Sequence, residues 1–174
     1  APRLVQSELH RNFDSVLIAN RGEIVMRVAR TATRMGLRTI GVCSWADRHA
    51  PHASCCDQTV IIGGERPAES YLDVQKILDA AIQTGAQAIH PGYGFLSENP
   101  HFAQSVIDAG LVWIGPSIEA MQQMGDKANA RRSMSKAGVP VLPGTEAFDD
   151  LMRLQQLGRQ MPLPVMIKAA AGGG

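Results

Sequence analysis

The chain has 174 residues, of which 45% are hydrophobic, and its 17 basic and 16 acidic residues give a formal net charge of +1. A chain of this size can bury a real core, and its length suits one domain and the beginning of a second. The near-neutral charge and the absence of a long basic block argue against nucleic-acid binding. No apolar run approaches the length of a membrane span, and the first dozen residues lack the apolar stretch of a secretory signal, so we expect no membrane partner.

The cysteines favour a cytoplasmic protein. Cys43, Cys55 and Cys56 show no CxxC spacing, and the adjacent pair could form a disulfide only with strain. We therefore expect reduced thiols, the usual state in the cytosol.

Short apolar runs recur along the chain, each ending in glycine or a polar residue and separated by helix-length stretches. They are SVLIAN, LRTIGVC, TVIIGG, AQAIHPGYG, LVWIGPS and PVMIK. Their Val and Ile content without strict alternation is typical of strands buried on both faces of a parallel sheet.

The stretch between the first two runs is predicted to be a helix. Asn20 and Glu23 resemble a capping box at its start, and Gly36 ends it. One apolar stripe at steps of three and four residues should pack on the sheet. It consists of Ile24, Val28, Ala32 and Met35.

Two further helices are expected, from about Tyr71 to Gln83 and from Pro100 to Ala109, the second opened by its proline. The inward residues of the former are predicted to be Leu72, Ile77, Leu78 and Ala81. Alternating strands and helices predict a doubly wound, Rossmann-like α/β sheet.

In such sheets ligands bind outside the carboxyl ends of the strands. A dinucleotide site is disfavoured at the first turn, because Arg21-Gly22-Glu23 has one glycine and does not make GxGxxG. Asp47, after the second run, mimics a ribose-binding acid. Without the glycines we interpret it as a turn or cap residue.

The loop HPGYGFLSEN, residues 90–99, follows an apolar run. Its glycines let a ligand approach the backbone closely, while Tyr93 offers an apolar ring and a hydroxyl. A turn that merely covers the end of the sheet explains the pattern equally well.

Two lysines are candidates for anion binding. Lys127, in Met124-Gly125-Asp126-Lys127, stands in the first turn of a predicted helix that ends at Gly138. A cation there opposes the helix dipole unless an anion binds, although a solvated lysine is the more common case.

Lys168 ends the last apolar run, where a bare ammonium group is costly to cover, and a glycine-rich stretch follows it. Glycine N–H groups can hold phosphate oxygens. A phosphate clamp is favoured here over a glycine-rich linker, although the Walker spacing is absent.

From about Phe13 to Gly174 the chain carries the segments IANRGEI, HPGYGFLSEN, WIGPS, MGDK, AGVPVLPG and PVMIKA. Through these segments it resembles, over this range, the biotin carboxylase family of the ATP-grasp superfamily. The resemblance covers roughly the first third of such a protein. It implies an N-terminal tail at residues 1–12 and a Rossmann-like N-terminal domain at 13–116. Residues 117–174 would be linking helices and the start of an ATP-grasp domain, truncated in its glycine-rich loop.

The resemblance also assigns roles. Lys127 and Lys168 resemble the family lysines that contact ATP phosphates. The start of the family's glycine-rich lid is similar to Gly172, Gly173 and Gly174. Ala171, just before them, stands where glycine is common in the family. Tyr93 and Gly94 should lie near the biotin ureido ring. His90 and Glu98 are expected to brace their loop.

The implied activity is that of an ATP-dependent ligase. ATP with Mg²⁺ or Mn²⁺ activates bicarbonate, and the carboxyl group passes to biotin on a carrier domain. Catalytic and metal-binding residues are expected beyond Gly174, so we predict that this chain alone is inactive.

Implied partners are a biotin carboxyl carrier, a carboxyltransferase component and a second copy of the subunit or a larger assembly. Arg30 fits the family dimer contact, whereas Arg34 replaces a residue that is often acidic. Cys55 and Cys56 have no inherited role. The final acceptor, whether an acyl-CoA such as acetyl-CoA, pyruvate or urea, is not specified.

Other classes remain as alternatives. A carboxylate–amine ligase of the ATP-grasp superfamily would share the first domain, but HPGYGFLSEN argues against it. A non-catalytic assembly module would dimerise or bind a partner while ignoring nucleotide. A redox dehydrogenase is the most distant alternative.

Overall fold

In the computed structural model of the chain, the described residues are 12–125, 127–142, 144–145, 150–161 and 163–167. They divide into two compact units, one ending at Ile118 and the other starting at Glu119.

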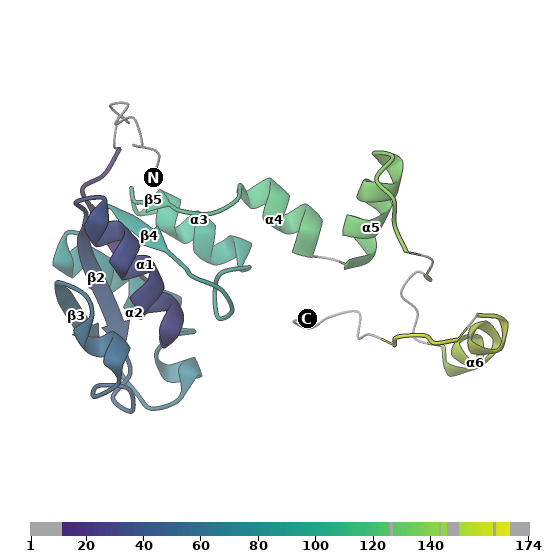
Figure 1. Cartoon of the computed structure of the whole chain (residues 1–174), viewed down its shortest axis with the longest axis horizontal. Coiled ribbons are helices and arrows are strands. Elements are labelled where there is room, and N and C mark those ends of the chain that lie inside the picture. The colour runs from purple at the N-terminus through teal and green to yellow at the C-terminus, as the bar shows by residue number, and fades with distance from the viewer. Residues whose placement is uncertain (1–11, 126, 143, 146–149, 162, 168–174) are drawn as a thin grey trace, which may run out of the picture. The chain divides into compact units, whose positions relative to one another are not determined.

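The first unit is built on a five-stranded sheet in which every pair of neighbouring strands is parallel (Figure 1). The strand order is β3-β2-β1-β4-β5. The strands are Ser15–Ile18 (β1), Arg38–Cys43 (β2), Gln58–Ile61 (β3), Ala88–His90 (β4) and Val112–Trp113 (β5). The order of connection reverses at β1, which pairs with β2 through Val16 and Thr39 and with β4 through Val16 and Ala88. The predicted parallel α/β sheet is confirmed.

Helices cover both faces of the sheet. Val16 and Ile18 pack towards Glu23–Arg34 (α1), whose buried residues are Val25, Ala29 and Ala32. Leu17 belongs to the larger core with Val74–Thr84 (α2) and Pro100–Asp108 (α3). Two short 3₁₀ helices, Pro51–Ser54 and Pro67–Glu69, lie between strands.

The predicted start of α1 is wrong. Gly22, not Asn20, is the N-cap, and no side chain caps the helix. Gly22 has φ +70° and turns the chain between the strand and the helix. The predicted apolar stripe is also displaced, because Val25 and Ala29 are buried, Ile24 and Val28 are half-buried, and Met35 is 49% exposed. Gly36, with φ +75°, follows the end of the helix as predicted.

The second helix starts three residues later than predicted. Asp73 is its N-cap and accepts a hydrogen bond from the Lys76 N–H, so Tyr71 and Leu72 precede the helix. Leu72 is 43% exposed, which corrects its inward assignment, whereas Ile77 and the other predicted core positions are buried. Helix α3 begins at Pro100, as expected, and the structure shows that Asn99 is its N-cap.

The second unit contains Ile118–Gly125 (α4, which begins at the boundary), Lys127–Lys136 (α5) and Leu151–Gln160 (α6). The predicted last strand, PVMIK, is wrong over its described residues. Val165, Met166 and Ile167 are exposed and have no strand conformation. An apolar run becomes a strand only when another strand supplies its hydrogen bonds, and no described segment does so here.

Candidate functional site at the carboxyl ends of β1, β2 and β4

Asn20, two residues after β1, ties the first turn to the loop after β4. Its Nδ2 donates to the carbonyl oxygens of Pro91 and Tyr93, each at 2.8 Å. Its Oδ1 accepts from the Arg21 N–H at 2.9 Å. Asn20 is only 3% exposed; its bond to Pro91 is buried, and its bonds to Tyr93 and Arg21 are partly buried.

Gly92 lets this loop come close to Asn20. It has φ +68°, and a Cβ on it would stand 2.7 Å from Asn20 Nδ2. The Gly92 N–H donates to His90 Nδ1 at 3.0 Å, so His90 braces the loop as expected. Burial lowers the pKa of His90, which favours the neutral ring that this bond requires.

Glu98, by contrast, does not brace the loop. Its side chain is exposed and makes no hydrogen bond or ion pair with any residue in the described part of the chain. The difference from His90 follows from position, because His90 ends a strand whereas Glu98 faces water.

Tyr93 and Gly94 lie at the exposed tip of the loop. Tyr93 is 60% exposed, and its hydroxyl donates to Glu23 Oε1 at 2.6 Å. This bond and the Glu23 charge raise the pKa of Tyr93. Gly94 has φ +66°, and nothing lies within 4 Å of the place where a Cβ would be. The loop therefore presents an aromatic ring and an uncovered backbone side by side.

Arg21 spans the same edge of the sheet. Its guanidinium carbon lies 5.7 Å from the ring centroids of both Tyr71 and Phe95, which stack at 5.2 Å and 14°. Its Nη1 lies 3.3 Å from Asp47 Oδ2. Phe95, with φ +45°, is the one described non-glycine residue with positive φ, and the stacking holds it there.

Asp47 is more than the turn residue that the sequence predicts. Its N–H bonds to the carbonyl of Ser44, as in a turn, but its Oδ2 also accepts from Tyr71 Oη at 2.7 Å and Ser44 Oγ at 3.1 Å. Burial acts to raise its pKa, but the bonds from Tyr71, Ser44 and Arg21 and the Arg21 charge outweigh it and lower the pKa. Asp47 is therefore a carboxylate at neutral pH.

Tyr71 and His52 complete the buried side of this cluster. Burial and Asp47 raise the pKa of Tyr71, so its phenol stays protonated. His52 Nε2 lies 3.5 Å from Tyr71 Oη, and burial lowers the pKa of His52. The roles of Asn20, Arg21 and Tyr71 were not apparent from the sequence. The one available signal was that the segment NRGE begins two residues after the first strand.

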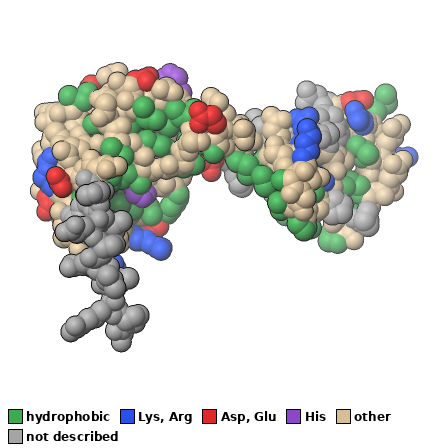
Figure 2. Space-filling model, turned by 90° about the horizontal axis from the view of Figure 1, so that it is seen from above, with side chains coloured by type: hydrophobic (Ala, Val, Ile, Leu, Met, Phe, Trp, Pro, Cys, Tyr) green, Lys and Arg blue, Asp and Glu red, His purple; other side chains and the backbone are tan. Residues whose placement is uncertain are grey.

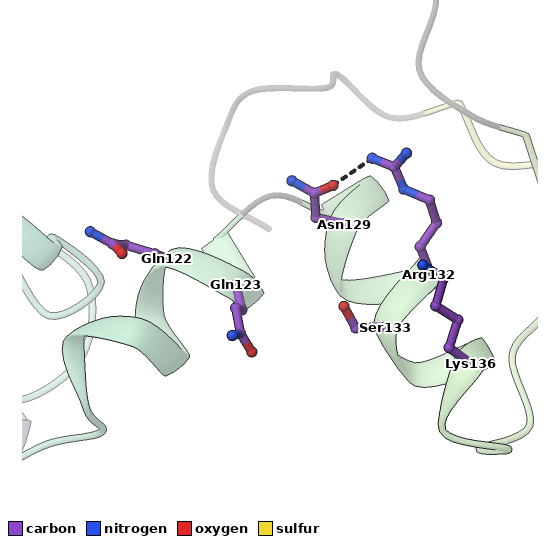
Figure 3. A pocket seen from close by; sticks show the side chains of 6 residues that line it. All are labelled: Gln122, Gln123, Asn129, Arg132, Ser133 and Lys136. Carbon is purple, nitrogen blue, oxygen red and sulfur yellow. Dashed lines mark hydrogen bonds between the residues drawn. The ribbon is translucent and has the colours of Figure 1, made fainter.

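The second unit carries a polar hollow of about 540 Å³ between α4 and α5 (Figure 3). Its lining residues are Gln122, Gln123, Asn129, Arg132, Ser133 and Lys136. Arg132 donates to Asn129 Oδ1. Basic side chains are visible on the surface of this unit (Figure 2).

Most of the predicted nucleotide-binding residues lie outside the described part. Lys168, Gly172, Gly173 and Gly174 belong to the residues that are not described. Lys127 is the first residue of α5, as the sequence predicts for a first-turn lysine, but its side chain is not described. Among described residues, no three His, Cys, Asp or Glu side chains are grouped to hold a metal, and no helix is long and apolar enough to cross a membrane.

The sheet order and the polar groups at its switch point define a Rossmann-like α/β domain of the kind that binds ligands at the carboxyl ends of its strands. Comparison with known proteins makes the assignment specific. Residues 12–121 match the family described as biotin carboxylase, N-terminal domain. Residues 126–174 match the ATP-binding domain of the carbamoyl-phosphate synthase L chain. The chain therefore belongs to the biotin carboxylase family.

Individual relatives support the same family assignment. Biotin carboxylase 2 of Bacillus subtilis is 47% identical over 163 residues, which are 93% of this chain and 37% of the relative. The mitochondrial methylcrotonoyl-CoA carboxylase subunit alpha of Glycine max is 46% identical over 97% of this chain and 23% of its own length. The chain thus spans about a third or less of these relatives.

Solved structures show the same fold. The biotin carboxylase of Campylobacter jejuni, in complex with a compound named beta-gamma-ATP, has a TM-score of 0.86 and 45% identity over 94% of this chain and 37% of its own. The biotin carboxylase domain of the 2-oxoglutarate carboxylase of Hydrogenobacter thermophilus, a dimer with MgADP, ADP and bicarbonate, has a TM-score of 0.85 and 40% identity, covering 95% of this chain and 36% of that one.

Proposed function

We propose that this chain forms the N-terminal part of a biotin carboxylase, an ATP-dependent ligase that carboxylates biotin on a carrier protein with bicarbonate. The observation that carries the proposal is the loop after β4. It is held at the switch point of the sheet by Asn20 and exposes Tyr93 and Gly94. The family assignment supports it.

Tyr93 and Gly94 are the proposed contacts for biotin. An exposed aromatic ring gives the bicyclic ring of biotin a flat apolar surface, and a glycine with nothing within 4 Å of its Cβ position permits close approach to the backbone on that side. These residues fit such a ligand, and their role is to bind and orient it.

The proposed contacts for ATP phosphates are two lysines, Lys127 and Lys168, and the glycines Gly172, Gly173 and Gly174. A lysine at the beginning of a helix and backbone N–H groups of a glycine run are suited to the phosphate charge. The nucleotides, magnesium and bicarbonate named for two similar structures support ATP with Mg²⁺, or Mn²⁺, as the cofactor and bicarbonate as the substrate.

The remaining proposals concern domains and partners. We place the N-terminal domain at 13–116 and the start of the ATP-grasp domain within 117–174, after a tail at 1–12. A biotin carboxyl carrier, a carboxyltransferase component and a second copy of the subunit are the proposed partners, in the cytoplasm. Because the chain spans 37% of the length of the Bacillus subtilis relative, we propose that catalysis requires residues that this chain does not contain and that the 174 residues alone are inactive.

The test is bicarbonate-dependent ATP cleavage stimulated by free biotin, measured on the complete protein that carries this sequence after its intact mass is known. Lys127→Ala and Lys168→Ala should each raise the KM for ATP about tenfold or more, the value of one charged hydrogen bond. Cleavage that ignores biotin would refute the proposal. Dimerisation or partner binding without any response to nucleotide would instead indicate an assembly module.

A further inference from the structure

Two side chains at the start of the β1–α1 segment hold the loop that carries Tyr93. Asn20 bonds to its backbone at Pro91 and Tyr93, and Glu23 bonds to the Tyr93 hydroxyl. We infer that Asn20 and Glu23 are positioning residues for biotin: Asn20 sets the backbone of the loop, and Glu23 sets the direction of the Tyr93 O–H. This inference rests on the proposed function.

Asparagine is suited to this position because the Asn20 amide meets complementary groups on both sides. Its nitrogen supplies two N–H donors to two carbonyl oxygens, while its oxygen accepts from the Arg21 N–H. Aspartate would keep the shape and the acceptor but would bring a negative charge against those carbonyl oxygens. At 3% exposure water cannot replace the lost bonds cheaply.

Gly92 makes the contact tight. With Asn20 Nδ2 only 2.7 Å from the position of a Gly92 Cβ, the loop is pressed against the amide. A residue 72 positions away in the sequence therefore decides where the backbone of Tyr93 and Gly94 lies. The bonds to Pro91 and Tyr93 flank Gly92 on both sides.

Glu23 acts on the side chain. A carboxylate is an acceptor only, so the bond of 2.6 Å commits the Tyr93 proton to Glu23. The remaining lone pairs of the Tyr93 oxygen then face away from Glu23 as acceptors. Tyr93 is thereby prepared for a ligand that donates an N–H, as a ureido ring does.

The first test uses Asn20→Asp and Asn20→Ala in the complete protein. We expect the KM for free biotin to rise about tenfold or more, as for a displacement of a binding group, with the KM for ATP unchanged. Asp73→Ala is the control, because it removes an N-cap bond of α2 that does not touch the loop. It should lower stability and leave the KM for biotin unchanged.

The second test uses Glu23→Ala and Glu23→Gln. Alanine should raise the KM for biotin several-fold, and glutamine, whose amide oxygen can still accept from Tyr93, should restore it largely. Glu119→Ala is the matched control, because Glu119 is also an acidic residue in the first turn of a helix but lies in α4.

A readout on the 174-residue chain checks the contacts themselves. The chain has two tyrosines, and ultraviolet titration of tyrosinate in Glu23→Gln should show the more exposed phenol ionising at lower pH than in the wild type. Chymotrypsin should cleave at Tyr93 faster in Asn20→Asp than in Asp73→Ala.

The outcomes separate the two proposals. Wild-type protein without biotin-stimulated ATP cleavage would overturn the proposed function and this inference with it. If the wild-type protein is active but the Asn20 and Glu23 variants have the same KM for biotin as their controls, the inference alone is overturned.

Discussion

Tyr71 Oη donates a hydrogen bond to Asp47 Oδ2 at 2.7 Å and accepts one from the Ser44 N–H at 3.0 Å. One buried phenol thus joins the turn after β2 to the segment before α2. Arg21, over the Tyr71 ring, adds the end of β1 to the same cluster. The cluster is the framework on which the loop of Tyr93 rests, through the stacking of Phe95 on Tyr71.

Tyr71→Phe should lower the free energy of unfolding by about 1–3 kcal/mol, because it leaves the buried Ser44 N–H without its partner and removes a bond to a carboxylate. Urea unfolding of the 174-residue chain measures the change. Tyr93→Phe is the control, since the ring of Tyr93 is mainly exposed, and should change stability by no more than about 0.5 kcal/mol. Equal losses in the two variants would contradict the role given to Tyr71.

Asp47 should make stability depend on pH. Its pKa is lower in the folded chain than the ordinary 3.8, so its contribution is complete above that pH and is lost as the pH falls through the folded value. Asp47→Asn should therefore be less stable than the wild type at neutral pH, by about 1–2 kcal/mol.

The difference in the free energy of unfolding between the wild type and Asp47→Asn should shrink at acidic pH. Urea unfolding over a pH series measures it. Asp57, whose pKa is also lowered, is present in both and cancels in the comparison. A difference that stays constant down to the most acidic measurable pH would show that Asp47 does not act as a carboxylate.

Gly92→Ala and Gly110→Ala form a matched pair. Both glycines have positive φ, +68° and +75°, so each substitution costs about 1–2 kcal/mol in backbone strain. Only the Gly92 variant also places a Cβ against Asn20, and nothing lies within 4 Å at Gly110. Gly92→Ala should consequently be the less stable in thermal unfolding, and the reverse order would argue against the tight contact.

Cys43 and Cys56 should react more slowly with alkylating reagents than ordinary surface thiols do. Burial, then the neighbouring Cys55, raises the pKa of Cys56 to about 12, and burial and Asp47 raise that of Cys43. All three are free, with 3.9 Å between the sulfurs of Cys55 and Cys56. Iodoacetamide at mildly alkaline pH should leave Cys43 and Cys56 unmodified in the native chain and label both after unfolding in urea.

Mass spectrometry of the peptides decides between the outcomes. Rapid labelling of Cys56 in the native chain would contradict the structure. So would formation of a disulfide after removal of reductant, seen as a loss of two hydrogens in the mass. Cys43→Ser serves as a check on the assignment of peptides to sites.

The motifs were sufficient to predict the family, because the matching segments occur in family order along nearly the whole chain. The elements were largely predictable as well. The helix that starts at Pro100 depends on its proline and the capping Asn99, which are neighbours in sequence. By contrast, the start of α1 was wrongly predicted because Asn20 has a stronger use, in bonds to residues 71 and 73 positions away.

What the sequence determined by itself is therefore what depends on neighbours along the chain: the alternation of strands and helices, the opening of α3 by Pro100, and the motifs with their order. The tertiary structure decided which carboxyl ends meet and hence that Asn20 and Glu23 hold the Tyr93 loop and that Tyr71 reaches Asp47. It also decided that Val165, Met166 and Ile167 do not form a strand here. The physical reason is that a hydrogen bond needs its partner within about 3 Å. For Asn20, Glu23 and Asp47 a distant segment supplies the partner, and for residues 165–167 no described segment does; no local pattern encodes either outcome.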